Sequence, residues 1–118
     1  MKTLTVPIFD MDVFLFTDRE EAKVFAHEGS LDNPHDRVLE TARGCYLTSY
    51  SCKRMLCIFD PITRIIAHEC VHVANGVIGE VGIKTSPAND ELHAYMVGWL
   101  VEEVLDLLDE ESALTGEV

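Results

Sequence analysis

Residues 60–100 read DPITRIIAHECVHVANGVIGEVGIKTSPANDELHAYMVGWL, and this stretch predicts two helices joined by a short connection. Asp60 and Pro61 predict the start of the first helix, because an aspartate side chain can cap free amides and proline fits the first helical position. We expect this helix to run to about Val77, since a series of glycines follows.

After Pro87, apolar side chains recur at steps of three and four residues, which predicts a long amphipathic second helix packed on the rest of the domain. These side chains are Leu92, Met96, Trp99, Leu100, Val104, Leu105 and Leu108. Acidic residues gather near the expected C-terminus of this helix, where the helix dipole disfavours them, so we expect residues 110–118 to be frayed.

The first helix contains the sequence His68-Glu69-Cys70-Val71-His72, which has the form His-Glu-x-x-His. An α-helix turns about 100° per residue, so His68 and His72 lie about 40° apart, one turn above the other. Both imidazoles can then bind one zinc ion, leaving room for a third protein ligand and a water molecule. Glu69 lies beside the water position and is predicted to be the general base of a hydrolytic reaction.

The apolar residues of the same helix predict how the motif is buried. Ile62, Ile65, Ile66 and Val73 surround the motif, so we expect both histidines to lie where the helix meets the core. Cys70 points away from the histidines and is predicted to be a small core residue.

A third zinc ligand is expected from the start of the second helix, which offers Asp90, Glu91 and His93. The side chains of Asp90 and His93 point about 100° and 200° away from that of Glu91, so the rotation of the helix decides which one binds. Tyr95 lies one turn beyond Glu91 and is predicted to hydrogen-bond a ligand carboxylate or a reaction intermediate. A position at the edge of the core is the alternative for this tyrosine.

The spacing of these residues resembles that of a known family. Eighteen residues separate His72 from Glu91, and this resembles the gluzincin branch of the zincin metallopeptidases, in which a glutamate of the following helix completes the zinc site. The run Asn89-Asp90-Glu91 with Ala94-Tyr95 and Gly98-Trp99-Leu100 is similar to small zincin-like proteins encoded by phages and prophages. The resemblance implies His68, His72 and Glu91 as zinc ligands and Glu69 as the catalytic base.

The rest of the chain predicts a small sheet and a further helix. Thr3 to Ile8 and Asp12 to Phe16 are predicted strands, and Gly44 to Tyr50 with Arg54 to Phe59 form a predicted antiparallel hairpin turning at residues 51–53. Thr17 and Glu20 match a capping box that begins a helix ending at Gly29. Residues 29–36 are a predicted loop, and residues 38–42 form either a strand or a helical turn.

The predicted fold class is therefore α+β: a minimal zincin-like domain with a small, mostly antiparallel sheet packed against the motif helix and the long C-terminal helix. A length of 118 residues predicts a single domain covering residues 1–118. The resemblance also implies that one strand of the hairpin presents its edge to an extended peptide. The alternative is that the hairpin is only core structure.

Composition limits the classes of partner. The net charge of -12 argues against nucleic acid as a ligand, because the protein would repel phosphate backbones. Cys45, Cys52, Cys57 and Cys70 are irregularly spaced and are predicted to be reduced thiols. The first residues are too polar for a secretory signal or a membrane span, so we expect no membrane association and a cytoplasmic location, that of the bacterial host if the chain is phage-encoded.

Two functions remain in competition. The first is a zinc metallopeptidase that hydrolyses a peptide or protein substrate. The small size of the chain suggests that it accepts a narrow range of substrates. The second is an acidic interaction or inhibitor protein, encoded by a phage and built on the same fold without proteolytic activity.

Overall fold

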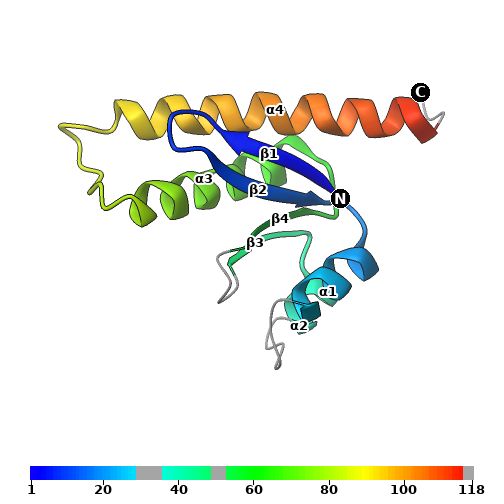
Figure 1. Cartoon of the computed structure of the whole chain (residues 1–118). Coiled ribbons are helices and arrows are strands. Elements are labelled where there is room, and N and C mark those ends of the chain that lie inside the picture. Colours follow the sequence, from blue (N-terminus) through cyan, green and yellow to red (C-terminus); the bar gives the residue numbers. More distant parts are fainter. Residues whose placement is uncertain (29–35, 49–52, 116–118) are drawn as a thin grey trace.

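The computed structural model describes residues 1–28, 36–48 and 53–115, and within these it has an α+β fold, as the sequence predicted. The elements in chain order are β1 (Lys2–Val6), β2 (Met11–Phe16), α1 (Arg19–Glu28), α2 (Asp36–Thr41), β3 (Gly44–Thr48), β4 (Arg54–Ile58), α3 (Thr63–Glu80) and α4 (Glu91–Thr115). Figure 1 shows α3 and α4 running side by side on one side of the strands, with α1 and α2 on the other.

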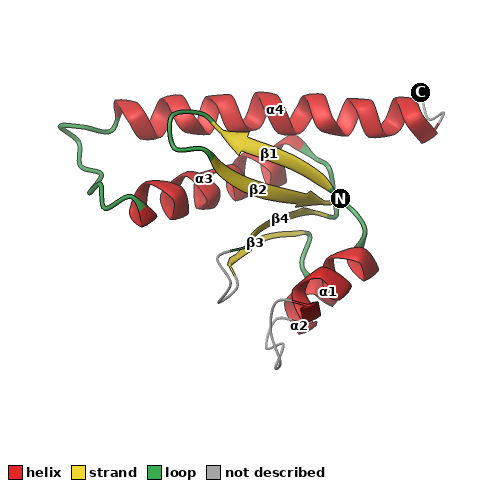
Figure 2. Cartoon of the chain, viewed as in Figure 1, coloured by secondary structure: helices red, strands yellow, loops and turns green. Residues whose placement is uncertain are grey.

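The four strands form one mixed sheet in the order β1-β2-β4-β3 (Figure 2). The hairpin pairs β1/β2 and β3/β4 are antiparallel, while β2 and β4 are parallel. A parallel pair needs a crossover connection, and residues 17–53, which contain α1, α2 and β3, supply it. Within the described residues, β1 and β3 are therefore the two edge strands.

Alternating side chains of the strands supply two separate cores. On the α3 and α4 side, Val13, Leu15, Leu56 and Ile58 pack with the buried faces of both helices. On the opposite side, Phe16, Met55 and Cys57 belong to a second core with residues of α1 and α2. Residues 55–58 are all buried, because β4 is an inner strand covered on both faces.

The connection between β1 and β2 begins earlier than the sequence suggested, because β1 ends at Val6 and not at Ile8. Pro7 cannot donate a ladder hydrogen bond, and it starts a turn in which Ile8 and Asp10 have positive φ angles of 74° and 51°. A proline followed by a positive φ is the arrangement of a type II turn, in which glycine would be the favoured residue at the position of Ile8.

Helix α1 is capped by Asp18 and not by Thr17, so the predicted capping box is wrong by one residue. The Asp18 carboxylate accepts hydrogen bonds from the backbone amides of Glu20 at 2.8 Å and Glu21 at 3.1 Å. Thr17 instead donates a hydrogen bond of 2.6 Å to Glu111, which ties the start of α1 to the far end of α4.

The ambiguous segment at residues 38–42 lies within and just after the short helix α2. The predicted hairpin is confirmed as β3 and β4. β4 ends at Ile58, one residue earlier than expected, while the predicted end of β3 at residues 49–50 and most of the predicted turn lie outside the described residues. Cys45 and Cys57 lie opposite each other in this hairpin and are free thiols, as is Cys70. Cys52 and residues 29–35 of the predicted loop are also outside the described part, while Asp36, the last residue of that loop, instead begins α2.

The start of α3 differs from the prediction. The residue that precedes the helix is Ile62, and no side chain caps the first amides. Asp60, the predicted cap, forms an ion pair with Arg43 from the segment before β3, with Nε and Oδ2 2.8 Å apart. The carboxylate is therefore used to fix the chain ahead of β3 and leaves the helix end uncapped.

The long helix α4 continues further than the sequence predicted. It is helical through Thr115, and residues 116–118 are outside the described part. The expected fraying from residue 110 stays a prediction. Met96, Leu100 and Val104 are buried against α3 and the sheet. In the described part of the chain, no helix combines the length and the apolar character that a membrane crossing requires.

Candidate metal centre

The histidines of the motif lie on the outward face of α3. Buried side chains such as Ile66, Cys70 and Val73 cover the opposite face, while His68 and His72 are both exposed. The expectation that the histidines lie at the boundary of the core is therefore wrong. The reason is that a helix with a wide apolar face still leaves one polar stripe, and the two histidines fall in its centre.

The two imidazole rings lie close together. The Nε2 atoms of His68 and His72 are 3.3 Å apart, and the rings stand nearly edge to face, with centroids 4.9 Å apart and an angle of 77°. Two nitrogens bound at about 2.0 to 2.1 Å to a tetrahedral zinc ion lie about 3.3 to 3.4 Å from each other. The separation of the two nitrogens therefore fits two ligands of a single ion.

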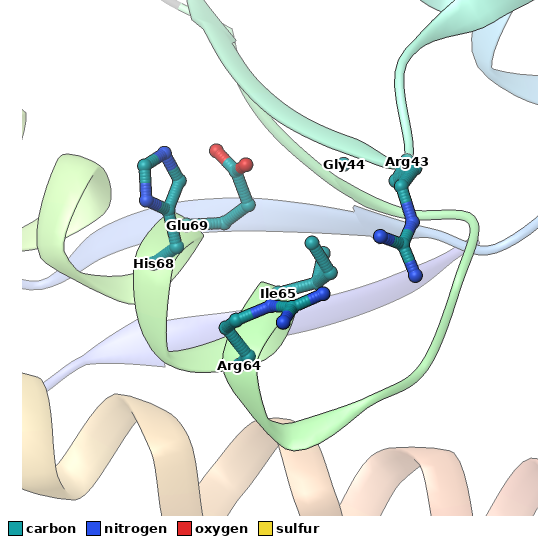
Figure 3. A pocket seen from close by; sticks show the side chains of 6 residues that line it. All are labelled: Arg43, Gly44, Arg64, Ile65, His68 and Glu69. Atoms are coloured by element: carbon teal, nitrogen blue, oxygen red, sulfur yellow. The ribbon is translucent and has the colours of Figure 1, made fainter.

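Glu69 belongs to the same group but is held differently. It is only 6% exposed, and one carboxylate oxygen together with one nitrogen from each histidine form a set whose atoms all lie within 4.8 Å of one another. Figure 3 shows the side chains of His68 and Glu69 leaving the same turn of α3, on the side along which β3 runs. Burial raises the pKa of Glu69 above its usual range, and the charges of His68 and His72 partly oppose that change.

The close approach of β3 to α3 depends on Gly44. A Cβ atom at this position would be 2.8 Å from Cγ2 of Ile65, 3.1 Å from Cγ of Glu69 and 3.1 Å from the carbonyl oxygen of Cys57. The absence of a side chain therefore lets the edge strand lie against the turn of α3 that carries the glutamate. Further along, Tyr46 packs in the same way against Gly76.

Glu91, the predicted third ligand, is not part of this group. It is the first residue of α4 and is exposed, and among the described residues only His68, Glu69 and His72 have ligand atoms this close together. A third tetrahedral ligand would have to bring its oxygen to about 3.3 Å from both histidine nitrogens. The assignment of Glu91 therefore stays a prediction.

The alternatives to Glu91 are placed differently. His93 lies against α3, where its Nε2 is 2.6 Å from Oδ1 of Asn75, and Asn75 follows His72 by one turn on the same stripe. Asp90 precedes the helix and is exposed. Of the three candidates, His93 is the one whose side chain is seen in contact with α3.

Tyr95 is 69% exposed and is therefore not a core-edge residue. It shares the outward side of α4 with Glu91, one turn away. Its proposed role toward a ligand or an intermediate stays a prediction. Cys70, by contrast, is fully buried as expected, and burial followed by the nearby charge of Glu69 raises the pKa of its thiol to about 12.

Two residues beside the motif were missed in the sequence. Arg43 and Arg64 line an open pocket together with Gly44, Ile65, His68 and Glu69. Arg64 precedes His68 by four residues, so helical spacing alone places it on the ligand stripe. Arg43 could not be found in this way, because only the packing of β3 on α3 brings it near.

No family model matches this chain, and the searches found no curated protein and no solved structure with significant similarity to it.

Proposed function

We propose that this chain is a zinc-dependent peptidase of the zincin type, in which His68 and His72 bind the ion and Glu69 acts as general base. The observation that supports the proposal is the geometry of the motif. The two Nε2 atoms have the spacing of ligands on one tetrahedral ion, and the carboxylate of Glu69 is next to both.

A bound zinc ion would supply a lowered pKa for a water molecule and polarise the carbonyl that is attacked. The task of Glu69 is to take a proton from that water and to pass it to the leaving amine. Burial limits the freedom of this side chain and raises the pKa of its carboxyl group above the usual range.

The edge of β3 supports a peptide as the substrate. Within the described residues this strand has one neighbour, β4, so its outer backbone groups can pair with an extended peptide. Because β3 lies against the turn of α3 that carries Glu69, such a peptide would pass beside the histidines. Nucleic acid stays disfavoured as a ligand, since the chain has a net charge of -12.

The proposal includes Glu91 as the third ligand, with His93 and Asp90 as alternatives. It also includes a cytoplasmic location, which rests on the irregular cysteine spacing and on free thiols at three of the four cysteines. An origin in a phage or prophage stays part of the resemblance that the sequence suggested.

The decisive experiment measures zinc content and peptide cleavage on the same preparations. Wild type is expected to hold about one zinc per chain and to cleave members of a peptide library, because His68 and His72 would bind the ion and Glu69 would act as the base. Glu69→Gln should keep the zinc and lose cleavage, since an amide cannot take a proton. Glu102→Gln, an exposed change on α4, is the matched control and should behave as wild type.

The third ligand is assigned in the same assay. Glu91→Ala, His93→Ala and Asp90→Ala are compared, and the one that loses zinc affinity while keeping the melting temperature of the metal-free protein identifies the ligand. Wild type that binds zinc but cleaves no peptide would contradict the peptidase proposal, and the acidic interaction protein would replace it. Wild type without zinc under metal-replete conditions would contradict both the metal site and the chemistry.

A further inference from the structure

The pocket beside the motif is unusual for this chain because of its charge. It is open, measures about 300 Å³, and is lined by two arginines, by Gly44 and Ile65, and by the motif residues His68 and Glu69. Figure 3 shows His68 and Glu69 at one side of this space and the guanidinium groups of Arg43 and Arg64 at the other. The pocket thus connects directly with the proposed reaction centre.

Two of only nine lysines and arginines in the chain are therefore gathered at one place. Arg43 is partly neutralised, because it forms the ion pair with Asp60. Arg64 is exposed, and no ion pair to it exists within the described residues. The arginine side of the pocket therefore has one guanidinium that is free to bind an anion.

The start of α3 adds to this positive charge. Arg64 and Ile65 belong to the first turn of the helix, which contains no acidic residue and has no side-chain cap at Ile62. The partial positive charge of a helix N-terminus is then not offset by the protein itself. Glu69 is the opposing charge in the pocket, but it belongs to the group formed with the two histidines.

We propose that this pocket binds a carboxylate of the substrate through Arg64, with Arg43 as the second positive group, so that cleavage occurs next to an acidic residue or next to the C-terminus of a peptide. This proposal rests on the proposed peptidase function. A guanidinium presents parallel N–H donors that fit the two oxygens of a carboxylate, and such charge-assisted bonds are stronger than neutral ones. Ile65 and Gly44 give the pocket an apolar wall, which suits the aliphatic part of a glutamate side chain.

The probes are fluorescein-labelled decapeptides of alanine, leucine and tyrosine in which one glutamate is moved through the sequence. Each has a twin with glutamine in the same place, and each is made with a free and with an amidated C-terminus. Binding is measured by fluorescence anisotropy to zinc-loaded Glu69→Gln protein, which avoids cleavage. Cleavage by the wild type is mapped by mass spectrometry on the same peptides.

We expect the glutamate peptide to bind about tenfold more tightly than its glutamine twin, the lower end for a hydrogen bond between charged groups. Adding Arg64→Gln to the same protein should bring that ratio close to one, and Arg64→Lys should leave it in between, because lysine cannot bind in the two-pronged way. Arg37→Gln removes an exposed arginine of α2 and should leave the ratio unchanged. A ratio that depends on the free C-terminus and not on glutamate identifies the terminal carboxylate as the group bound.

The two proposals fail in different ways. Cleavage by the wild type without any preference for a carboxylate overturns the pocket and leaves the peptidase standing. A preference in binding that disappears with Arg64→Gln, in a wild type that cleaves nothing, supports the pocket and overturns the peptidase. A ratio that persists in Arg64→Gln, or no binding of any peptide at millimolar concentration, overturns the pocket.

Discussion

Gly44→Ala should destabilise the protein, although alanine is normally the better residue inside an element of secondary structure. Replacing glycine by alanine raises the free energy of unfolding by about 0.5 to 1 kcal/mol, because it reduces the conformational entropy of the unfolded chain. The new Cβ would lie 2.8 Å from Cγ2 of Ile65 and 3.1 Å from the carbonyl oxygen of Cys57, and the second of these is backbone. Overpacking of this kind costs about 1 to 3 kcal/mol, so after the gain is subtracted we expect a net loss of about 1 kcal/mol, and of at most about 2.5 kcal/mol.

The assay is urea denaturation of the metal-free protein, followed by fluorescence of the single tryptophan, Trp99. Gly98→Ala is the control, because a Cβ there has no neighbour within 4 Å, and it should stabilise α4 by about 0.5 to 1 kcal/mol. In an Ile65→Ala background the cost of Gly44→Ala should shrink by about 1 kcal/mol, since the closest clash is gone. A Gly44→Ala protein as stable as Gly98→Ala, or a cost that Ile65→Ala leaves unchanged, would refute the reasoning.

Three further predictions concern other parts of the molecule. The hydroxyl of Tyr46 is buried without a hydrogen-bond partner among the described residues, so Tyr46→Phe should raise the free energy of unfolding by about 1 kcal/mol at neutral pH. Burial, with a smaller contribution from Glu80, raises the pKa of Tyr46 to about 12. The folded state therefore holds the phenol proton more tightly than the unfolded state does. The free energy of unfolding of the wild type should fall by about 2 to 3 kcal/mol as the pH rises from 10 through 12. Tyr46→Phe should not show this fall, and urea titration at each pH measures it. Ile8→Gly should raise the free energy of unfolding by about 0.5 to 1 kcal/mol, because glycine adopts the positive φ of 74° without the strain of a β-branched residue, and the side chain that is lost is 79% exposed. Ile8→Ala keeps the strain and is the control. An equal gain in Ile8→Ala would point to another cause. Removal of zinc by a chelator should lower the melting temperature of the wild type, because only the folded state binds the ion. The double variant His68→Ala, His72→Ala is the control and should melt at the same temperature with and without chelator. Equal melting curves for the wild type with and without chelator would contradict a bound metal.

Much of the fold could be predicted because its signals are local. The helix that carries the motif, the amphipathic helix after it and the hairpin of β3 and β4 each follow from the spacing of apolar residues over one short stretch. The errors also have local causes. Thr17 and Asp18 are both good caps, and sequence cannot decide between neighbours. Asp60 was predicted to cap α3, but an arginine that is distant in sequence binds it instead.

The site was only partly predictable for the same reason. His68, Glu69 and His72 come from one helical turn, so their mutual spacing follows from helix geometry. The burial of Glu69 against β3 and the arrival of Arg43 at the same pocket depend on how two elements pack, and no periodicity records that. Which residue of α4 would serve as the proposed third ligand depends on the rotation of α4 relative to α3, and moving by one residue along a helix changes the direction of the side chain by about 100°.

The outward position of the two histidines determines how a metal ion would bind and dissociate. His68 and His72 are exposed while the core of α3 lies behind them, so an ion can reach both nitrogens in the folded protein without any opening of the hydrophobic core. Exchange of a bound ion would then be limited by the breaking of ligand bonds and not by global unfolding, which is orders of magnitude slower in a stable domain. Such a site would remain in equilibrium with the metal available around it throughout the lifetime of the protein, rather than being filled once as the chain folds.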